Sequence, residues 1–531
     1  MSEHPRIFEG MFEFRLCDPG ELRPLGDAAL IDAITAAARA TAAAEARQLA
    51  AIAELTRRRL GAKAPGWGCD EWDQAAAEVS CALTVKHGRA MNLMLRAMTL
   101  AEELPKVGAL FLAGEITAWT AATIVNRTEN VIDPEVRAQI DTDIAETITG
   151  WGPLSQTKLE ATIDTVVADR DPDAVRRSRA TVASRSITIG DPRDDGSDLT
   201  SIWGKLSITD AALLDATLNA MAKAVCEDDP RTLAQRRADA MGALAAQSDR
   251  LICGCDNPDC PAKTGASPAA RVTVTVVTNA PVTPAPRRRT NTVASPGPVD
   301  AAGPAGPAPG ARPVAFVPGR AGGFISAEAL AALIALGAKV RTVTAPGPDP
   351  ERRYRPSTAL DAFVRTRDLS CRWPGCDRPA AESDIDHSNP WDDGGHTHPS
   401  SLNVKCRLHH LIRTFAPGWS ETQHPDGTLT ITSPTGHSYT SKPLSGILFP
   451  DWNTTTAQPP PPGKPRRKRG PGRTLMKPAR KRDRATLRAQ RIKRERALNA
   501  AAIAAEDAAA QAAARAAGKP PPPGRYDPPP F

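Results

Sequence analysis

The chain has 531 residues, 41% of them hydrophobic but only 4% aromatic, with 50 prolines, 38 glycines and a formal net charge of +7. This length predicts about three or four domain-sized units, and the proline and glycine content predicts long linkers. No uncharged apolar run of about 18 residues is present, so we expect no transmembrane helix, and the start at Met1 does not look like a secretory signal. The cysteines cluster in spacings typical of metal sites rather than of a disulfide framework, which favours a reducing cytoplasm.

The first half of the chain is rich in alanine and predicts helices. After an irregular stretch over residues 1–25, we expect a helical accessory domain over residues 26–278. Apolar residues recur at helical spacing until Leu104 and Pro105, where the proline stops the helix. Helices are expected over residues 27–59, 71–103, 116–124 and 154–169. A short helix is also expected to end before Gly114, and three more are expected to begin near Pro134, Asp210 and Pro230. Strands are expected over residues 186–189, 201–208 and 271–278.

A short cysteine cluster lies near the end of this domain. Cys253, Cys255 and Cys260 follow a C-x-C-x4-C spacing. Three thiols so close together suit a soft metal such as zinc, but a tetrahedral zinc site needs a fourth ligand. Cys226 and Asp259 are both candidates for that ligand, and the alternative is an incomplete set that binds no metal.

The composition changes after the last expected strand. Residues 279–322 are rich in proline, alanine, glycine and arginine with almost no large apolar side chains, which predicts a disordered linker. A helical lead-in is expected over residues 323–367. Its first helix follows Ser326, a favoured capping residue, and its second begins at Ala359.

The stretch over residues 371–413 concentrates the residue types that bind metals and act as bases. It contains three of the ten cysteines, and seven of the nine histidines lie over residues 387–437. Metal ligands and general bases are drawn from these residue types. Their concentration in so short a part of the chain therefore predicts a chemical site.

One set of candidate metal ligands can be recognised from its spacing in the sequence. Cys371 and Cys376 form a C-x4-C knuckle, bent by a proline and a glycine, and Cys406 and His409 form a C-x2-H pair at the expected start of a helix. Together they make a set of three cysteines and one histidine, which is typical of a closed structural zinc site. Such a site would hold together a segment that is too small to build its own core.

The second set is Asp386, His387, Asn403 and His410. Asp386 and His387 end a short expected strand, so their side chains point to opposite faces. His409 and His410 are adjacent on a helix and point about 100° apart, so they cannot easily bind one metal. We therefore expect His409 to face the cysteines and His410 to face the strand.

These two sets resemble the HNH endonuclease motif, a ββα-metal fold, whose three letters fall on His387, Asn403 and His410. The common form of the family ends in C-x2-C-H, whereas a histidine replaces the second cysteine here and keeps four residues that can bind zinc. The resemblance implies that Asp386 and His410 hold one catalytic divalent ion such as Mg²⁺, that His387 is the general base, and that Asn403 holds the loop that orients His387. It also implies phosphate contacts from Lys405, Arg407 and Arg413.

The helical half resembles the domain of unknown function, DUF222, that precedes the HNH motif in the actinobacterial 13E12-repeat proteins of mycobacteria. The segments that carry this resemblance are Leu104-Pro105, A-G-E-I-T over 113–117 and Q-R-R-A-D-A over 235–240. The resemblance brings no known activity for the helical domain. The predicted fold class is therefore a mainly α N-terminal domain followed by a small ββα-metal (HNH) domain over residues 368–450, in which a short hairpin follows the motif.

The residue types of the second set suit phosphodiester hydrolysis. This reaction needs a water deprotonated in line with the leaving oxygen and positive charge on the developing oxyanion. A neutral histidine can take the proton, while one carboxylate and one imidazole leave open positions on a hard ion. We therefore expect a metal-dependent endonuclease that acts on DNA. The alternative is a non-catalytic DNA-binding or mobile-element protein whose zinc-stapled module has only the fold.

The basicity of the chain belongs to its tail, over residues 451–531. Residues 464–496 contain sixteen Lys and Arg against two acidic residues, a local charge of +14, which leaves +7 − 14 = −7 for the rest of the chain. Residues 485–516 could be helical. The charge favours a sequence-independent DNA arm that acts through counterion release, and the alternative is a solvated, disordered tail. The DNA contacts expected from this arm include Arg466, Arg467, Lys468 and Arg469.

Overall fold

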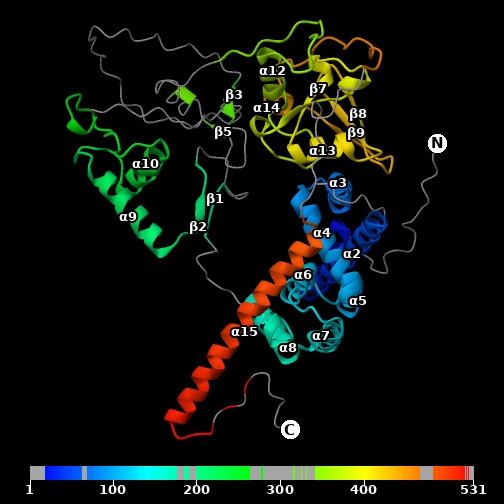
Figure 1. Ribbon diagram of the computed structural model, residues 1–531, viewed down its shortest axis with the longest axis vertical. Helices are drawn as coiled ribbons and strands as arrows, with labels where there is room; N and C mark the ends of the chain where they lie inside the picture. Colours follow the sequence, from blue (N-terminus) through cyan, green and yellow to red (C-terminus); the bar gives the residue numbers. More distant parts are fainter. Residues whose placement is uncertain are drawn as a thin grey trace.

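The structure is a computed structural model in which a helical N-terminal region lies below a smaller C-terminal unit, and the first part of a long helix, α15 (Arg484–Ala516), runs along the helical region (Figure 1). None of the described helices combines the length and the apolarity that crossing a bilayer requires. The residues that the structure describes are 18–61, 69–175, 185–190, 199–263, 277–278, 315–316, 324–325, 330–331, 341–466, 482–520, 522 and 524.

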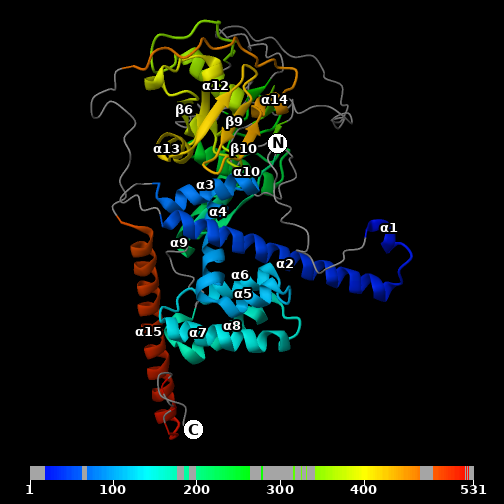
Figure 2. The same cartoon turned by 90° about the vertical axis from the view of Figure 1, so that its right-hand side faces the viewer.

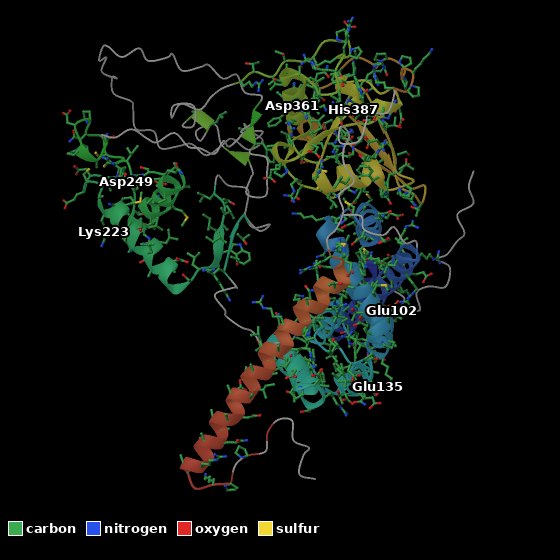
Figure 3. The ribbon with its side chains drawn as sticks, viewed as in Figure 1. Glu102, Glu135, Lys223, Asp249, Asp361 and His387 are labelled. Carbon is green, nitrogen blue, oxygen red and sulfur yellow. The ribbon has the colours of Figure 1, made fainter. Side chains whose placement is uncertain are left out.

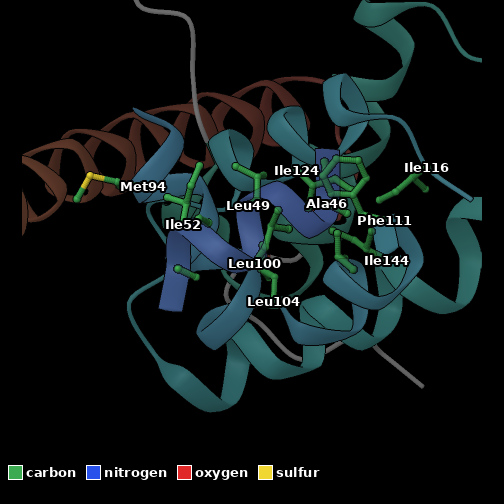
Figure 4. Packing of buried hydrophobic residues seen from close by; sticks show 14 of the residues in the cluster. Ala46, Leu49, Ile52, Met94, Leu100, Leu104, Phe111, Ile116, Ile124 and Ile144 are labelled. Atoms are coloured by element: carbon green, nitrogen blue, oxygen red, sulfur yellow. The ribbon is translucent and has the colours of Figure 1, made fainter. Parts of the chain in front are cut away.

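The N-terminal region is a bundle built around α2 (Asp27–Leu60), which spans 34 residues. Buried alanines on one face of α2, such as Ala46 and Ala53, let neighbouring helices approach closely. Larger side chains such as Met94 and Phe111 fill the remaining core (Figure 4). The other elements of this region are α1 (Pro19–Leu22), α3 (Glu71–Leu83), α4 (His87–Met98), the π-helix η1 (Thr99–Glu103), α5 (Pro105–Leu112), α6 (Ala118–Arg127), α7 (Pro134–Thr147), the 3₁₀ turn η2 (Ile148–Gly150), α8 (Gln156–Arg170) and the 3₁₀ turn η3 (Pro172–Ala174).

The single helix expected over residues 71–103 is wrong, because two α-helices and a π-helix occupy this stretch. Asp70 caps α3 by accepting a hydrogen bond from the Asp73 backbone at 3.1 Å. The helix then ends because Thr84 adopts a left-handed conformation, with φ of 52°. A non-glycine residue rarely takes this conformation, so the apolar periodicity gave no warning of the break. The chain turns at Thr84 and continues as α4.

Two small substructures follow the bundle. The strands β1 (Ser186–Ile189) and β2 (Ile202–Lys205) pair antiparallel, and the helices α9 (Ile208–Lys223) and α10 (Leu233–Ala245) pack on each other. The second strand is shorter than the expected stretch over 201–208. The reason is that Ser207 caps α9 by accepting from the Asp210 backbone at 3.0 Å, so the helix begins inside that stretch.

Three two-residue strands form a sheet in the order β3-β4-β5. Strand β4, Ala315–Phe316, falls inside the expected linker over 279–322. An apolar run, V-A-F-V, interrupts the prolines and glycines there, so the expected disorder is wrong for these two residues. The strands are β3 (Val277–Thr278), β4 (Ala315–Phe316) and β5 (Phe324–Ile325). Most of the linker over 279–322, of the strand expected over 271–278 and of the helix expected after Ser326 lies outside the described residues.

The C-terminal unit is built on two antiparallel strands followed by a helix. Strand β6 (Asp384–His387) pairs with β7 (Leu402–Lys405) so that Asp386 lies opposite Asn403. Helix α13 (Arg407–Phe415) follows directly and completes a ββα arrangement. Together with the mainly helical N-terminal region, this arrangement and its cluster of cysteines and histidine confirm the predicted fold class.

Further elements surround this ββα arrangement. Ser357 caps α12 (Thr358–Asp368), which packs on β7. The hairpin expected after the motif is a three-stranded sheet in the order β10-β9-β8. Its strands are β8 (Ser420–Gln423), β9 (Leu429–Thr432) and β10 (Ser438–Ser441), and the other elements of this unit are α14 (Leu444–Leu448) and the 3₁₀ turns η6 (Ala380–Glu382), η7 (Trp391–Asp393) and η8 (Pro399–Ser401). A further 3₁₀ turn, η5 (Pro261–Lys263), lies earlier in the chain, after α10.

Helix α3 and the C-terminal unit share one apolar cluster. Ala77 and Cys81 of α3 pack with Trp373 of the knuckle. Gly375 lies against the Val85 backbone with φ of +73°, and a Cβ at this position would come within 2.5 Å of the Val85 carbonyl oxygen. The two parts of the chain are therefore joined through a buried contact.

The tail contains α15 (Arg484–Ala516), in agreement with the helix expected over residues 485–516. Both views show its N-terminal part lying along the N-terminal helical region and its C-terminal end extending beyond it (Figures 1 and 2). Ile492, Asn499 and Ile503 recur on one face of α15 and are buried. For these residues the alternative of a solvated, disordered tail does not hold, because part of the helix surface is covered.

Candidate metal centres and catalytic site

Cys371, Cys376, Cys406 and His409 converge on one point inside the shared apolar cluster. Their ligand atoms all lie within 4.8 Å of one another. His409 Nδ1 is 3.2 Å from Cys406 Sγ and 3.5 Å from Cys371 Sγ. The first two cysteines come from the knuckle, and the other two ligands come from the start of α13. The set fits a tetrahedral zinc ion, which binds thiolates and neutral imidazole.

The thiols of this cluster shift one another's pKa. Hydrogen bonds from Cys371 and Cys376 lower the pKa of Cys406, while burial raises the pKa of Cys371. A divalent cation would stabilise the deprotonated form of every thiol in the group. Burial lowers the pKa of His409, so the ring is neutral as a ligand must be. Trp373 stacks on that ring at 4.8 Å and fixes its orientation.

His410 follows His409 on α13 but faces β6. Its Nε2 lies 3.3 Å from Asp386 Oδ1, and its Nδ1 lies 2.9 Å from Asp384 Oδ2. Burial alone would lower the pKa of His410, but the hydrogen bonds and charges of the two carboxylates outweigh it and raise the pKa. Metal-binding histidines commonly carry a carboxylate on their second nitrogen, which fixes the ring. Asp386 and His410 thus offer one oxygen and one nitrogen to an ion, with Asp384 as the support.

His387 ends β6 with its ring largely buried. Its Nε2 is 3.0 Å from Thr397 Oγ1, and that hydroxyl donates to the Arg353 carbonyl at 2.6 Å. Because a carbonyl oxygen cannot donate, the hydroxyl proton points to Arg353, and the Thr397 oxygen accepts from His387. Nε2 therefore carries the proton, and Nδ1 has the free lone pair.

The surroundings of His387 also set its charge. Burial lowers its pKa to about 4, although the nearby Asp386 charge acts in the opposite direction. Tyr354 stacks on the ring at 5.2 Å, and Trp391 meets it edge-on at 5.8 Å. The ring is consequently neutral at pH 7 and can accept a proton.

Asn403 is fully buried on β7. Its Nδ2 donates to Ser388 Oγ at 3.0 Å and to Gln423 Oε1 at 3.3 Å. Ser388 directly follows His387, so Asn403 contacts the loop that leaves the end of β6. This contact provides a physical basis for the role implied for Asn403, which stays a prediction.

The basic residues expected to contact phosphate differ in their exposure. Lys405 is fully buried, and its Nζ lies 2.8 Å from Glu421 Oε2 and 3.3 Å from Asp386 Oδ2. A phosphate cannot reach this ammonium group, so the predicted role of Lys405 is wrong. Arg413 is also largely covered and donates to the Ser388 carbonyl at 3.0 Å.

Two other basic residues lie nearer the surface. The Arg407 side chain is 58% exposed and pairs with Asp384 at 3.2 Å, so it can still turn toward a ligand. Arg466 lies over the Trp391 ring at 3.8 Å and donates to the Gly395 carbonyl at 2.8 Å. It therefore holds the start of the tail on the loop that follows β6. Arg467, Lys468 and Arg469 lie outside the described residues.

The second cysteine cluster gains its fourth member from the loop after α9. The ligand atoms of Cys226, Cys253, Cys255 and Cys260 all lie within 4.8 Å of one another. Of the two candidates for the fourth position, Cys226 therefore joins the group. The four thiols could together hold a zinc ion. Figure 3 shows the hairpin of α9 and α10 that carries this cluster, with Lys223 and Asp249 labelled, well apart from the unit that holds His387.

Several contacts of the site come from residues that the sequence analysis did not single out. Asp384 lies two residues before Asp386 on the same face of β6, and strand alternation could have indicated it. The others come from distant segments and carry no local signal, because only the folded chain brings them to the site. They are Tyr354, Thr397, Glu421 and Gln423.

The fold and the cysteine clusters define a helical protein with a small ββα module and two candidate zinc sites. Residues 36–368 match the model of a domain of unknown function, DUF222, and the chain belongs to this family. It is 49% identical over 496 residues to the uncharacterized protein Rv3776 of Mycobacterium tuberculosis (strain ATCC 25618 / H37Rv), covering 92% of this chain and 93% of that protein. It is 47% identical over 516 residues to the uncharacterized protein Rv2100 of the same strain, covering 93% and 92%. No solved structure matches the chain.

Proposed function

We propose that this protein is a metal-dependent endonuclease of the HNH type that hydrolyses phosphodiester bonds of DNA. The observation that carries the proposal is the pairing of Asp386 Oδ1 with His410 Nε2 at 3.3 Å, beside the neutral ring of His387. Asp384 supports His410 at 2.9 Å. The donor set of one carboxylate and one imidazole suits a hard ion such as Mg²⁺. A zinc ion held by the three cysteines and His409 would fix α13, and with it His410, to the knuckle.

The residues divide the reaction between them. A divalent ion bound by Asp386 and His410 would supply positive charge to a phosphate oxygen and to the leaving oxygen. His387 Nδ1 accepts a proton from water while the water oxygen forms a bond to phosphorus. The bond from phosphorus to the ester oxygen breaks, and the leaving oxygen takes a proton from solvent. Thr397 keeps the His387 proton on Nε2 and so keeps Nδ1 available.

One observation favours a second function, that of a non-catalytic nucleic-acid-binding protein. Lys405 Nζ lies 3.3 Å from Asp386, so a buried cation already partly neutralises the carboxylate that a divalent ion would need. The same ammonium group is held at 2.8 Å by Glu421. If Lys405 prevents ion binding, the module would fold on zinc and bind DNA without cleaving it.

Nicking of supercoiled plasmid by the purified full chain, with Mg²⁺ or Mn²⁺ and with a chelator, separates the two functions. We expect metal-dependent nicking by the wild type and loss of most of it in His387→Ala and His410→Ala, both with unchanged zinc content. His424→Ala, which removes an exposed histidine of the same unit, is the matched control and should cut normally. A folded, zinc-loaded wild type that never nicks would contradict the nuclease and support the second function.

The same assay tests the tautomer assigned to His387. Thr397→Val keeps the side-chain shape but removes the oxygen that accepts from Nε2, so nicking should slow about 10-fold or more. Thr397→Ser keeps the oxygen and should restore most of the rate. Nicking at the wild-type rate by the valine variant would show that Thr397 does not position His387.

A further inference from the structure

Helix α15 carries arginines that the charge pattern assigns to a DNA arm, yet they contact acidic residues of the N-terminal region. Arg484 Nε lies 2.7 Å from Asp70 Oδ2, and its Nη2 lies 2.7 Å from Asp73 Oδ1. Further along the helix, Arg496 Nη1 lies 2.6 Å from Asp171 Oδ2. The three contacts hold both ends of the basic half of the helix.

Two more arginines fill the space between these ends. Glu129 pairs with Arg491 and lies 3.8 Å from Arg488 Nε. Arg488 also lies 3.9 Å from Glu103. The acidic partners come from α3, η1, the loop after α6 and the residues before η3, which the fold lines up along α15 (Figure 2). We name this set the acidic strip: Asp70, Asp73, Glu103, Glu129 and Asp171.

Buried groups anchor the helix in addition to the ion pairs. Asn499 is fully buried, and its Nδ2 donates to the Asp173 carbonyl at 2.6 Å and to the Val175 carbonyl at 2.8 Å. Ile492 and Ile503 are buried on the same face. Surface ion pairs alone contribute little each, so these buried contacts set the register in which the arginines meet the strip.

While α15 is docked, the arginines that pair with the acidic strip cannot also bind DNA phosphates. Its guanidinium groups are paired with carboxylates, and phosphate is the other anion that guanidinium groups prefer. From its first turn α15 also runs away from the C-terminal unit in both views (Figures 1 and 2). Lys493 and Arg494 are exposed on its outer face, so a polyanion can first contact the helix there.

We propose that the acidic strip is an intramolecular docking site for α15 that competes with nucleic acid for the same arginines. The tail then exchanges between the strip and a DNA duplex, and the apparent affinity for DNA is reduced by the fraction of molecules in which the helix is docked. This inference rests on the proposed DNA binding, but it does not depend on cleavage.

The test compares two double variants of the full chain with equal charge change. Glu129→Arg/Asp171→Arg reverses two carboxylates of the strip, and Glu115→Arg/Glu146→Arg reverses two exposed acidic residues of the same region that do not contact α15. Hydrogen exchange of α15 reports docking, and anisotropy of a labelled DNA duplex over a range of salt reports binding. We expect faster exchange, about 10-fold tighter binding and a steeper salt dependence in the strip variant than in the control variant.

Reversing the charge of the partner arginines as well tests whether the ion pairs themselves hold α15 on the acidic strip. Adding Arg491→Glu and Arg496→Asp to the strip variant restores opposite charges, so slow exchange of α15 should return. Equal duplex affinity and equal exchange in the strip and control variants would overturn the proposal, as would a chain that binds no duplex in any form. A failure to nick plasmid affects only the proposed nuclease, because the comparison measures exchange and binding.

Discussion

At the scale of single residues, the environment of His387 decides whether its ring can work as a base. An exposed histidine titrates near pH 6.5 and is partly protonated in neutral solution. Here burial lowers the pKa to about 4, and the stacked Tyr354 ring covers one face. The ring is therefore fully neutral at pH 7, and the hydroxyl of Thr397 selects the tautomer.

The low pKa of His387 predicts a loss of stability with acid. Its folded pKa is about 4, whereas the unfolded chain has the ordinary value of 6.5. Above pH 6.5 the ring is neutral in both states and contributes nothing. Between pH 6.5 and about 4 the unfolded chain binds a proton that the folded chain does not, so the free energy of unfolding falls as the pH falls through this window. From pH 7 to pH 5 the loss is at most about 2 kcal/mol.

His387→Gln removes this titration. In urea unfolding of the zinc-loaded chain at pH 7 and at pH 5, the wild type should lose more stability than His387→Gln between the two pH values. His424→Gln removes an exposed histidine and should behave like the wild type. Equal losses in the wild type and in His387→Gln would mean that His387 titrates normally.

At the scale of elements, local patterns predicted the motif well. Cys371 with Cys376 and Cys406 with His409 are pairs of near neighbours in the sequence, and β6 and α13 lie where the sequence predicted a strand and the start of a helix. What the pattern missed depends on contacts between distant segments. The break at Thr84 is a left-handed residue beside the knuckle, and Glu421 reaches the site only because β8 folds back.

The four-cysteine group that contains Cys226 makes a prediction at this scale. The full chain should bind two zinc ions, one in each cysteine cluster, as measured by elemental analysis of the purified protein. Cys226→Ser should remove one ion and loosen the α9–α10 hairpin, because structural zinc contributes about 10 kcal/mol or more to a small unit.

Asp259→Asn is the matched control for the second site. Asp259 is exposed and lies outside the group of four thiols, so the variant should keep both ions. A single zinc ion in the wild type, or two in Cys226→Ser, would contradict a metal at this cluster.

At the scale of the whole molecule, polar contacts as well as the shared apolar cluster join the C-terminal unit to the N-terminal helical region. Lys86, in the turn between α3 and α4, pairs with Asp377, which directly follows the knuckle, at 2.5 Å. His87 meets the His409 ring at 5.7 Å, and its Nε2 lies 3.2 Å from Asp73, which also binds Arg484 of α15. The C-terminal unit, the turn after α3 and helix α15 therefore meet around the same few residues.

Gly375 lies against the Val85 backbone at this junction, so we expect its replacement by alanine to destabilise the protein. Alanine there would need the left-handed φ of +73°, and its Cβ would lie 2.5 Å from the Val85 carbonyl oxygen. The first effect costs about 1 kcal/mol, but the second forces the knuckle away from the turn. Gly436→Ala is the matched control, because Gly436 has φ of +83° and no atom within 4 Å of an added Cβ. Thermal unfolding of both variants should show a clearly larger loss for Gly375→Ala, with faster hydrogen exchange at the end of α3. Equal losses would mean that the backbone strain alone matters and that the knuckle does not hold the two parts together.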